Sequence, residues 1–374
     1  MEEMVRIPVV IYRGGTSKAI FLKENLLPAD PTTRDRLICA LFGSPDKRQI
    51  DGLGGADPLT SKLAIIGPPS RPDADVDYTI GQVDILSTHI DYSAVCGNIS
   101  AAVGPYAIDE GFVRPEEPVT KVRIHCKNVG RIIEAYVPVE NKQVKVCGDY
   151  AIDGVPGTGA KIDLNWVDLV GANTGALLPT GKPQEKLNIP GIGSVSVSIV
   201  DVGNPGVFVK AKDLGLRGNE RPEEVDSNAD LIRTSDYIVE EAGKRIGTFT
   251  LLTYVAPPMN YVSHTTGEEI RSENIDLLVR MIFMGKMHKA YAASQINCCG
   301  AAALIPGTVV NEVASATLPS KGKVRLGHPA GIAELETIVD KKGEQIIFSR
   351  IVVSRTARRL MEGYAFVRQD LLDR

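Results

Sequence analysis

The sequence predicts an α+β fold made of two similar, β-rich domains that contain few helices. Its 374 residues exceed what one ordinary hydrophobic core accommodates, which favours two domains. Short β-rich runs bounded by turn residues outnumber the segments with helical spacing. The second half of the chain also repeats the order of signals found in the first half, which is typical of two related domains.

The first signals along the chain describe a hairpin followed by a helix. Two β-rich runs, 5–12 and 18–23, flank the turn RGGTS at 13–17. A helix is expected over 31–42, because Pro31 opens a segment with helical spacing and Gly43 closes it. Further strands are expected at 76–87, 121–125, 131–137 and 143–146, and the Gly-, Pro- and Asn-rich segment 153–190 is expected to be a loop and a connection between domains.

The repeat is visible where segment 195–214 is laid on segment 6–26. Both contain a strand, a Gly-containing turn, an apolar strand, and then Asn or Asp before Leu. Each half later has a Cys-Gly pair followed by small residues, beginning at Cys96 and at Cys299. The identities are few, so two unrelated β-rich domains with chance glycine turns remain the alternative.

Composition and charge exclude several functional classes. The chain is 43% hydrophobic and 24% charged, as is usual for soluble globular proteins. A net charge of −4 provides no basic face for nucleic acid. The acidic start MEEMVRIPVV lacks a secretory signal, and no apolar run reaches the roughly 18 residues of a membrane span. We therefore expect a cytoplasmic protein with no nucleic-acid or membrane partner.

The cysteine and histidine residues do not support a metal site. None of the 6 cysteines forms a Cys-x-x-Cys pair, and the 5 histidines are scattered without metal-ligand spacing. Thiols in an acidic chain without a signal peptide are expected to be reduced. The sequence therefore gives no support for a metal site.

Cys96 stands before Gly97, Asn98 and a run of small residues, a pattern that favours the start of a helix. The free N–H groups of a first helical turn bind anions, and the helix dipole favours negative charge there. The backbone N–H groups of Gly97, Asn98 and Ile99 are thus candidates for binding a substrate carboxylate. The same environment favours a reactive thiolate at Cys96. The alternative for Cys96 is a buried structural cysteine.

Lys62 follows a Gly-rich polar loop at the point where an apolar strand begins. A lysine at such a junction can project into a cleft, where burial favours the neutral amine and makes it a usable base. The alternative is a solvated lysine at a strand end.

Four segments resemble the PrpF family: RIPVVIYRGGTSKA (6–19), IDGLGGADPLTSKLAIIG (50–67), CGNISAAVGP (96–105) and RLGHPAG (325–331). That family is similar in fold to diaminopimelate epimerase. The resemblance implies two domains, each a curved, mainly antiparallel sheet around a central helix, with the active site in the cleft between them. The expected domains are 1–188 and 189–354, with the tail 355–374 packing back onto the first.

The resemblance also implies the roles of individual residues. Lys62, in its DPLTSK context, and Cys96, in its CGN context, match the family's catalytic positions. Ser17 in the RGGTS turn is expected to contact substrate, and His288 in MGKMHKAY (284–291) resembles another motif near the site. The complete set of expected substrate-binding residues is Ser17, Ser61, Gly97, Asn98, Ile99, His288 and Cys298.

The activity that the resemblance implies is a cofactor-independent 1,3-proton shift in a small unsaturated di- or tricarboxylate. A base must remove an acidic C–H near a carboxylate, and preorganised donors must meet the developing charge. The family includes isomerases of 3-methylitaconate and methylaconitate and a tautomerase of 4-oxalomesaconate, and this sequence is most similar to the first group. The expected reaction is of the type 3-methylitaconate to 2,3-dimethylmaleate. The alternatives are cis–trans isomerisation of 2-methylaconitate or aconitate, 4-oxalomesaconate tautomerisation, and a non-catalytic accessory role.

Two other enzyme classes are weaker alternatives. A cysteine hydrolase would need a histidine base near Cys96, supplied by His125, His264 or His288. A pyridoxal-phosphate enzyme would need a phosphate cup beside Lys62, and GVPGTGAK at 154–161 lacks the P-loop spacing. The expected partner is a small unsaturated carboxylate, and assembly into a homo-oligomer is left open.

Overall fold

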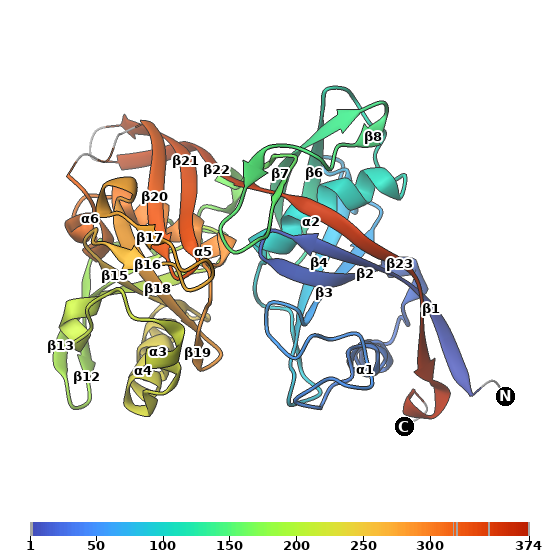
Figure 1. The fold of residues 1–374 in the computed structure, drawn as a ribbon, viewed down its shortest axis with the longest axis horizontal. Coiled ribbons are helices and arrows are strands. Elements are labelled where there is room, and N and C mark those ends of the chain that lie inside the picture. The colour runs from blue at the N-terminus through green and yellow to red at the C-terminus, as the bar shows by residue number, and fades with distance from the viewer. Residues whose placement is uncertain (1–2, 317, 319–320, 343–344, 373–374) are drawn as a thin grey trace. The chain divides into compact units, whose positions relative to one another are not determined.

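The computed structural model describes residues 3–316, 318, 321–342 and 345–372 and divides the chain into two compact units (Figure 1). The first unit contains Met1–Ala151, Gly157–Leu164 and Arg355–Arg374, and the second contains Ile152–Pro156 and Asn165–Ser354. Residues 152–156 and 165–188, which the sequence analysis places in the first domain, therefore lie in the second unit. The last residues, from 355 onward, lie in the first.

The sheet of the first unit has the order β23–β1–β2–β3–β4–β6–β7. Its neighbours are antiparallel except for β2–β3 and β4–β6, which are parallel. Parallel neighbours need a long crossover, and a helix follows in the chain at each such step. The strands are β1 (Met4–Gly14), β2 (Ser17–Lys23), β3 (Lys62–Gly67), β4 (Val76–Val83), β6 (Val119–Cys126), β7 (Arg131–Glu140) and β23 (Ala357–Arg368).

The two helices of the first unit are α1 (Pro31–Phe42) and α2 (Gly97–Asp109), and they pack against opposite faces of the sheet. Leu63 and Ile65 of β3 belong to the same buried cluster as the apolar side chains of α1. On the other face, Phe21 of β2 contacts Tyr106 of α2, with ring centroids 5.0 Å apart. Helix α2 is the buried centre of the unit, because every residue from Gly97 to Ile108 is buried.

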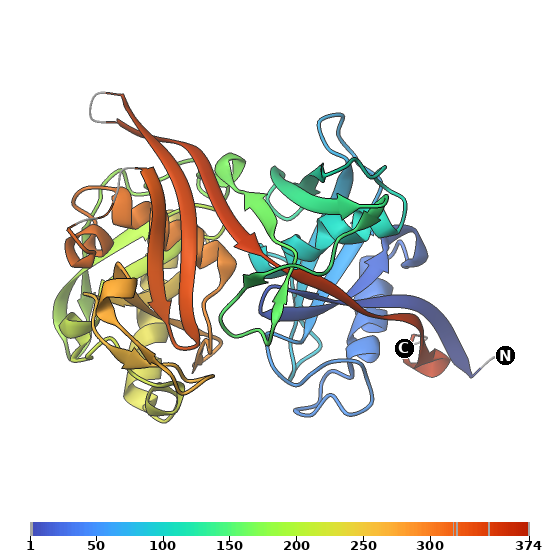
Figure 2. The same cartoon turned by 45° about the horizontal axis from the view of Figure 1, so that its top comes forward.

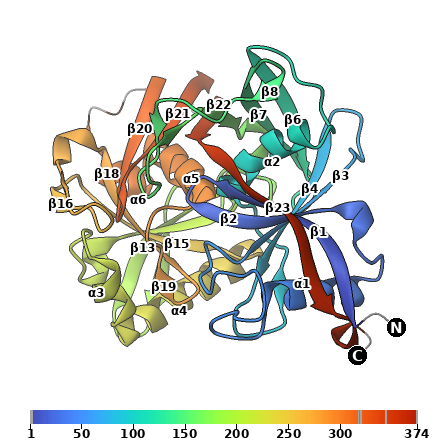
Figure 3. The ribbon, with the colours of Figure 1, turned by 45° about the vertical axis from the view of Figure 1, so that its right-hand side comes forward.

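Helix α1 has the bounds that the sequence predicts. The side chain of Asp30 accepts a hydrogen bond from the Thr33 N–H at 2.8 Å and caps the start. Gly43 ends the helix in the left-handed conformation, with φ of 78°. In Figure 3 strands β1 and β23 run side by side to the two chain ends, and their register pairs Met4 with Arg368.

The sheet of the second unit has the order β12–β13–β14–β15–β18–β20–β21–β22. Its parallel steps are β14–β15 and β18–β20, and helices again occupy the connections. The long strands β20, β21 and β22 lie side by side (Figure 2). The elements are β12 (Glu185–Ile189), β13 (Gly193–Val200), β14 (Gly206–Lys210), α3 (Pro222–Asp226), α4 (Ala229–Ile246), β15 (Leu251–Ala256), β18 (Leu277–Phe283), α5 (Ala293–Leu304), α6 (Val309–Val313), β20 (Lys321–His328), β21 (Gly331–Lys342) and β22 (Gln345–Arg355).

The remaining elements are short. They are η1 (Glu24–Leu26), β5 (Ile90–Asp91), β8 (Gln143–Val144), β9 (Tyr150–Ala151), β10 (Thr158–Gly159), β11 (Ile162–Asn165), η2 (Val167–Leu169), η3 (Ala211–Leu214), β16 (Tyr261–Val262), β17 (Glu269–Ile270), η4 (Ser272–Asn274), β19 (Lys286–Met287) and η5 (Gln369–Leu371). The segment 153–190 thus contains β10, β11 and β12 rather than only loop. The strand expected at 76–87 ends at Val83. Among the described residues, no helix combines the length and the apolar character required to cross a membrane.

The two units repeat one topology, and one ion pair recurs at the same place in both. Asp75, before β4, accepts a hydrogen bond from the backbone N–H of Arg123 on β6 at 2.7 Å. Asp276, before β18, accepts one from the backbone N–H of Arg325 on β20, also at 2.7 Å. Each arginine also forms an ion pair with its aspartate, at 2.6 and 2.9 Å. The repeat inferred from the sequence is therefore real.

The alignment of the two Cys-Gly pairs within that repeat is wrong. Cys96 is the residue before α2, whereas Cys299 lies inside α5 and Ala292 is the residue before that helix. Gly104 and Gly300 are the matching glycines, because each faces the next strand of its own sheet. A Cβ at Gly104 would lie 2.7 Å from Val137, and one at Gly300 would lie 2.2 Å from Leu335. Close helix–sheet packing, rather than reactive chemistry, explains the second Cys-Gly pair.

Candidate active site

Lys62 is the first residue of β3 and lies on the face of the sheet that packs against α2. Side chains alternate along a strand, and Leu63 and Ile65 point toward α1, so Lys62 points to the other side. Its side chain is buried, with 7% exposed. Its Nζ donates a hydrogen bond to Oε1 of Gln82, its cross-strand neighbour on β4, at 2.5 Å. The lysine is thus held in one place by a neutral partner.

The loop before Lys62 is organised around Gln49, which is buried and has a left-handed backbone with φ of 44°. Its Oε1 accepts hydrogen bonds from the Ser61 hydroxyl at 2.7 Å and from the Ala56 N–H at 2.8 Å. Ser61 is 0% exposed. Ser61 lies in the loop just before β3, and its side chain is directed toward Gln49. The structure therefore gives the Ser61 hydroxyl a role in holding the loop.

Cys96 immediately precedes α2, with an extended backbone at φ −111° and ψ 98°. It is partly exposed, and its carbonyl accepts hydrogen bonds from the N–H and the hydroxyl of Ser100, both at 2.9 Å. The N–H groups of Gly97, Asn98 and Ile99 belong to the first helical turn, where the helix supplies no acceptor. The helix start predicted at Cys96 is confirmed. N–H groups in a first helical turn are able to donate hydrogen bonds to an anion.

The β1–β2 turn packs directly on this helix start. Asn98 Nδ2 donates to the Thr16 hydroxyl at 3.1 Å, and Asn98 Oδ1 accepts from the Thr16 N–H at 3.4 Å. Gly15 has φ of 49°, and a Cβ there would lie 2.1 Å from Asn98 Oδ1. Only glycine permits both this backbone and this approach. The turn RGGTS is therefore shaped to fit the helix.

Ser17 follows the turn and begins β2. It is 2% exposed, and its hydroxyl has no hydrogen-bond partner among the described residues. Two residues further, Ala19 pairs with Lys62 in the parallel β2–β3 ladder. Ser17, Ala19 and Lys62 therefore share the face and the strand ends next to the start of α2. An unpaired buried hydroxyl is costly, and a ligand that accepts its hydrogen bond would remove that cost.

Arg355 is a further residue of this cluster that the sequence reasoning missed. It is 5% exposed, and its Nε donates to Asn98 Oδ1 at 3.0 Å. Burial lowers the pKa of Arg355 to about 10, while Coulomb attraction to Tyr150 and Cys96 opposes that shift. Thr356, next in the chain, accepts a hydrogen bond from the Gly15 N–H at 2.9 Å. No local motif marks Arg355, because it reaches the site only through the return of the chain to the first unit.

The candidates His288 and Cys298 belong to the second unit. His288 is buried, and its Nδ1 accepts a hydrogen bond from the Ala290 N–H at 3.1 Å. Cys298 is 0% exposed, accepts from the Val202 N–H at 3.1 Å and donates to the Asn204 carbonyl at 3.0 Å. Burial raises the pKa of the Cys298 thiol well above its usual range. The structure thus gives Cys298 a packing role on the β13–β14 turn.

His125 does not support a cysteine hydrolase. Its Nδ1 lies 2.9 Å from Asp77 and 3.3 Å from the Ser70 hydroxyl. On β6 the residues that alternate with His125, such as Ile124 and Cys126, are the buried ones, and α2 packs on that buried face. The histidine ring therefore lies on the face of the sheet opposite α2 and Cys96. Among the described residues, no group of three His, Cys, Asp or Glu side chains could hold a metal ion.

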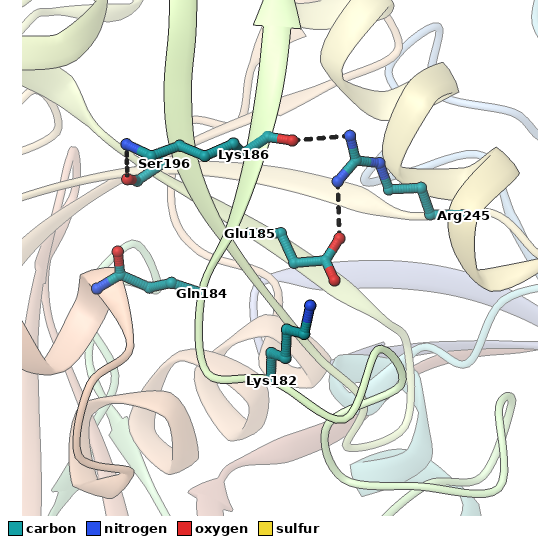
Figure 4. A pocket seen from close by; sticks show the side chains of 6 residues that line it. All are labelled: Lys182, Gln184, Glu185, Lys186, Ser196 and Arg245. Carbon is teal, nitrogen blue, oxygen red and sulfur yellow. Dashed lines mark hydrogen bonds and ion pairs between the residues drawn. The ribbon is translucent and has the colours of Figure 1, made fainter.

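A pocket of about 370 Å³ on the second unit has cationic side chains in its lining but offers little chemistry (Figure 4). Arg245 forms an ion pair with Glu185 at 2.7 Å and donates to the Lys186 carbonyl at 2.7 Å. Lys186 donates to the Ser196 hydroxyl at 2.8 Å. Arg245 and Lys186 therefore already have partners within this pocket.

Comparison with known proteins gives consistent matches over the whole chain. The PrpF protein family matches residues 4–368. A protein of Eubacterium barkeri described as 3-methylitaconate isomerase is 48% identical over 385 aligned positions and matches 100% of both chains. A 2-methyl-aconitate isomerase of Cupriavidus necator is 36% identical, with 98% of each chain covered.

Solved structures agree with these matches. A crystal structure of methylitaconate-delta-isomerase superposes with a TM-score of 0.81 at 47% identity, covering 99% of this chain and 98% of the other. A hydroxyproline epimerase of Agrobacterium vitis superposes with a TM-score of 0.61 at 11% identity, covering 99% and 94%. The second match concerns the fold alone, and it supports the diaminopimelate-epimerase-like architecture expected from the sequence.

Proposed function

Since this chain belongs to the PrpF family and is an isomerase, we propose that it catalyses a 1,3-proton shift in a small unsaturated dicarboxylate of the 3-methylitaconate type. The observation that carries this proposal is the cluster around the start of α2. There a buried lysine, a cysteine and an unpaired serine hydroxyl come from three separate segments of the first unit. The 48% identity to a 3-methylitaconate isomerase favours this substrate over larger tricarboxylates.

In the proposed reaction a proton leaves the carbon that bears the methyl group and one carboxylate. The electron pair of that C–H bond forms the new internal double bond. The electrons of the former terminal C=CH2 double bond take up a proton at the terminal carbon, which becomes a methyl group. No atom is gained or lost overall, and no oxidant is required. Lys62 and Cys96 are the proton-transfer pair. Both groups exchange protons readily with water, so solvent hydrogen is expected in the product.

The substrate carboxylate next to the reacting carbon accepts hydrogen bonds from the first-turn N–H groups of α2 and from the Ser17 hydroxyl. Negative charge increases on this carboxylate as the C–H bond breaks, so these donors act most strongly in the transition state. Removing one such donor typically costs about 3–4 kcal/mol of barrier height. Asn98 and Arg355 hold the helix start in position. The enzyme is expected to act in the cytoplasm, where its six free cysteines would stay reduced.

Turnover in D2O tests the proposal. Enzyme dialysed against EDTA is incubated separately with 3-methylitaconate, 2-methylaconitate and 4-oxalomesaconate, and the mixtures are followed by proton NMR. We expect fastest turnover of 3-methylitaconate, with deuterium in the new methyl group and, near equilibrium, in recovered substrate. Faster turnover of another substrate would reassign the specificity. Activity lost on chelation, or turnover without deuterium in any product, would contradict the mechanism.

A further inference from the structure

Gln82 on β4 has a side-chain amide whose orientation is fixed by its surroundings. Its Nε2 donates to the backbone carbonyls of Pro58 at 3.2 Å and Ser61 at 3.1 Å. A carbonyl oxygen can only accept, so the NH2 group must face these two atoms. The Oε1 atom therefore faces Lys62 and accepts from its Nζ at 2.5 Å. Exchanging the two ends of the amide would break both hydrogen bonds to the backbone carbonyls and leave oxygen facing oxygen.

This arrangement restricts the amine of Lys62. An amide oxygen is never a donor, so one N–H of Lys62 must point toward Gln82 in both protonation states. A neutral amine has one lone pair, which accepts the proton when the amine acts as a base. Because one N–H of Lys62 points toward Gln82, the lone pair can point in fewer directions than in a freely rotating amine. Because the side chain is buried, water has little access to it. The position of Nζ is thus set by β4 and not by the lysine chain alone.

The neutrality of the acceptor matters as much as its position. A carboxylate in the same place would favour the charged ammonium and withhold the base at neutral pH. The cross-strand neighbours of Lys62, Ala19 on β2 and Gln82 on β4, carry no charge. The start of α2 on the same side carries Cys96, with Arg355 near it. The amide therefore provides a hydrogen bond without an ion pair.

We propose that Gln82 is the positioning residue of Lys62, which directs the nitrogen to the reacting carbon and keeps it available as a base. This inference rests on the proposed function, because it assigns Lys62 a proton-transfer role. The same amide binds the end of the preceding loop, since Pro58 and Ser61 supply its acceptors. The Lys18 N–H and the Leu59 carbonyl, 2.9 Å apart, tie that loop to β2. Loop and lysine are consequently held by one side chain.

Two substitutions separate orientation from charge. Gln82→Glu keeps the size and the acceptor toward Lys62, adds a negative charge and removes the donors to the Pro58 and Ser61 carbonyls. Gln82→Met keeps the volume and removes the acceptor as well as the donors, so comparing the two variants isolates the effect of the charged acceptor. We expect the acid limb of the kcat/KM profile of Gln82→Glu to move at least one pH unit higher, with tenfold or greater loss at pH 7 and recovery at high pH. We expect Gln82→Met to lose at least tenfold in kcat at every pH, with KM within threefold of wild type. Gln143→Glu is the control, because it makes the same change at an exposed position of the same unit.

A readout without turnover separates this inference from the proposed function. The rate at which trinitrobenzenesulfonate labels Lys62 is measured against pH by peptide mass spectrometry, with circular dichroism confirming the fold. We expect labelling of Lys62 in Gln82→Glu to require higher pH than in wild type and in Gln143→Glu. Superimposable profiles for wild type and Gln82→Glu, in labelling and in kcat/KM, would overturn the inference. If Gln82→Glu does not fold, Gln82→Met and Gln82→Asn decide, and kcat within threefold of wild type for either would overturn it.

Discussion

Ser17 and Ser61 carry the same hydroxyl group in different surroundings, so replacing each by alanine should have different consequences. The Ser17 hydroxyl has no hydrogen-bond partner among the described residues, although it is buried. Ser17→Ala therefore costs the folded protein no hydrogen bond, and its free energy of unfolding should stay at or slightly above that of wild type. A hydrogen bond to a charged group is worth about 1.5–3 kcal/mol. Its loss should lower kcat/KM roughly 10- to 150-fold.

Ser61→Ala should show the reverse pattern. The Ser61 hydroxyl is 0% exposed and donates to Gln49 Oε1 at 2.7 Å. Removing it weakens the pairing of a buried amide oxygen and should lower the free energy of unfolding by about 1–3 kcal/mol. Since this hydroxyl is bound to Gln49 in the loop, kcat/KM should fall less than in Ser17→Ala.

The assay for this pair is urea unfolding followed by circular dichroism, combined with the change in ultraviolet absorbance on turnover. The double bond is conjugated with one carboxylate in the substrate and with both in the product. Each serine variant serves as the control for the other, because the chemical change is identical. The reasoning would be refuted if Ser17→Ala lost as much stability as Ser61→Ala. It would also be refuted if Ser17→Ala kept kcat/KM within twofold of wild type.

Three further predictions concern the same unit. Lys62→Ala and Cys96→Ala should keep the circular dichroism spectrum of the native protein and lose more than tenfold in kcat. Such a loss corresponds to an increase in the reaction barrier of more than about 1.4 kcal/mol. A smaller loss in either variant would contradict the catalytic role of that residue. Arg355→Gln should slow alkylation of Cys96 by iodoacetamide several-fold at pH 7, because the attraction between the Arg355 guanidinium and negative charge at Cys96 is lost. Arg359→Gln is the control, because the Arg359 guanidinium lies 2.7 Å from Glu110, just past the other end of α2. This variant should alkylate at the wild-type rate, and equal slowing in both variants would show a general structural effect. Gly15→Ala should lower the free energy of unfolding by about 1–3 kcal/mol from its left-handed backbone alone, measured by urea unfolding, and an unchanged value would contradict the packing described here.

Local chemistry accounts for the parts of this protein that the sequence could predict. Pro31 and Gly43 mark the ends of α1, and small residues after Cys96 mark the start of α2. The strand that begins at Lys62 follows a polar loop. In each case the signal lies within a few residues of the feature, because capping and turn preferences act over that distance.

The pairing of distant segments decided the rest. Ser17 and Ser61 look alike in the sequence, yet strand alternation places Ser17 on the same face as Lys62, whereas the Ser61 hydroxyl binds Gln49 in the loop. Cys96 and Cys299 share a Cys-Gly pair, yet the second lies inside a helix because Gly300 must approach β21.

The sequence by itself determined that this is a duplicated α+β chain with a helix that begins after Cys96 and a lysine at a strand end. Only the tertiary structure decided which side chains support them. Gln82 contacts Lys62 because β4 pairs with β3, and Arg355 contacts Asn98 because the chain returns to the first unit after completing the second. Neither contact leaves a local pattern. A hydrogen bond between neighbouring strands, or between segments far apart in the sequence, depends on strand register and on the path of the backbone. Short-range preferences do not specify either.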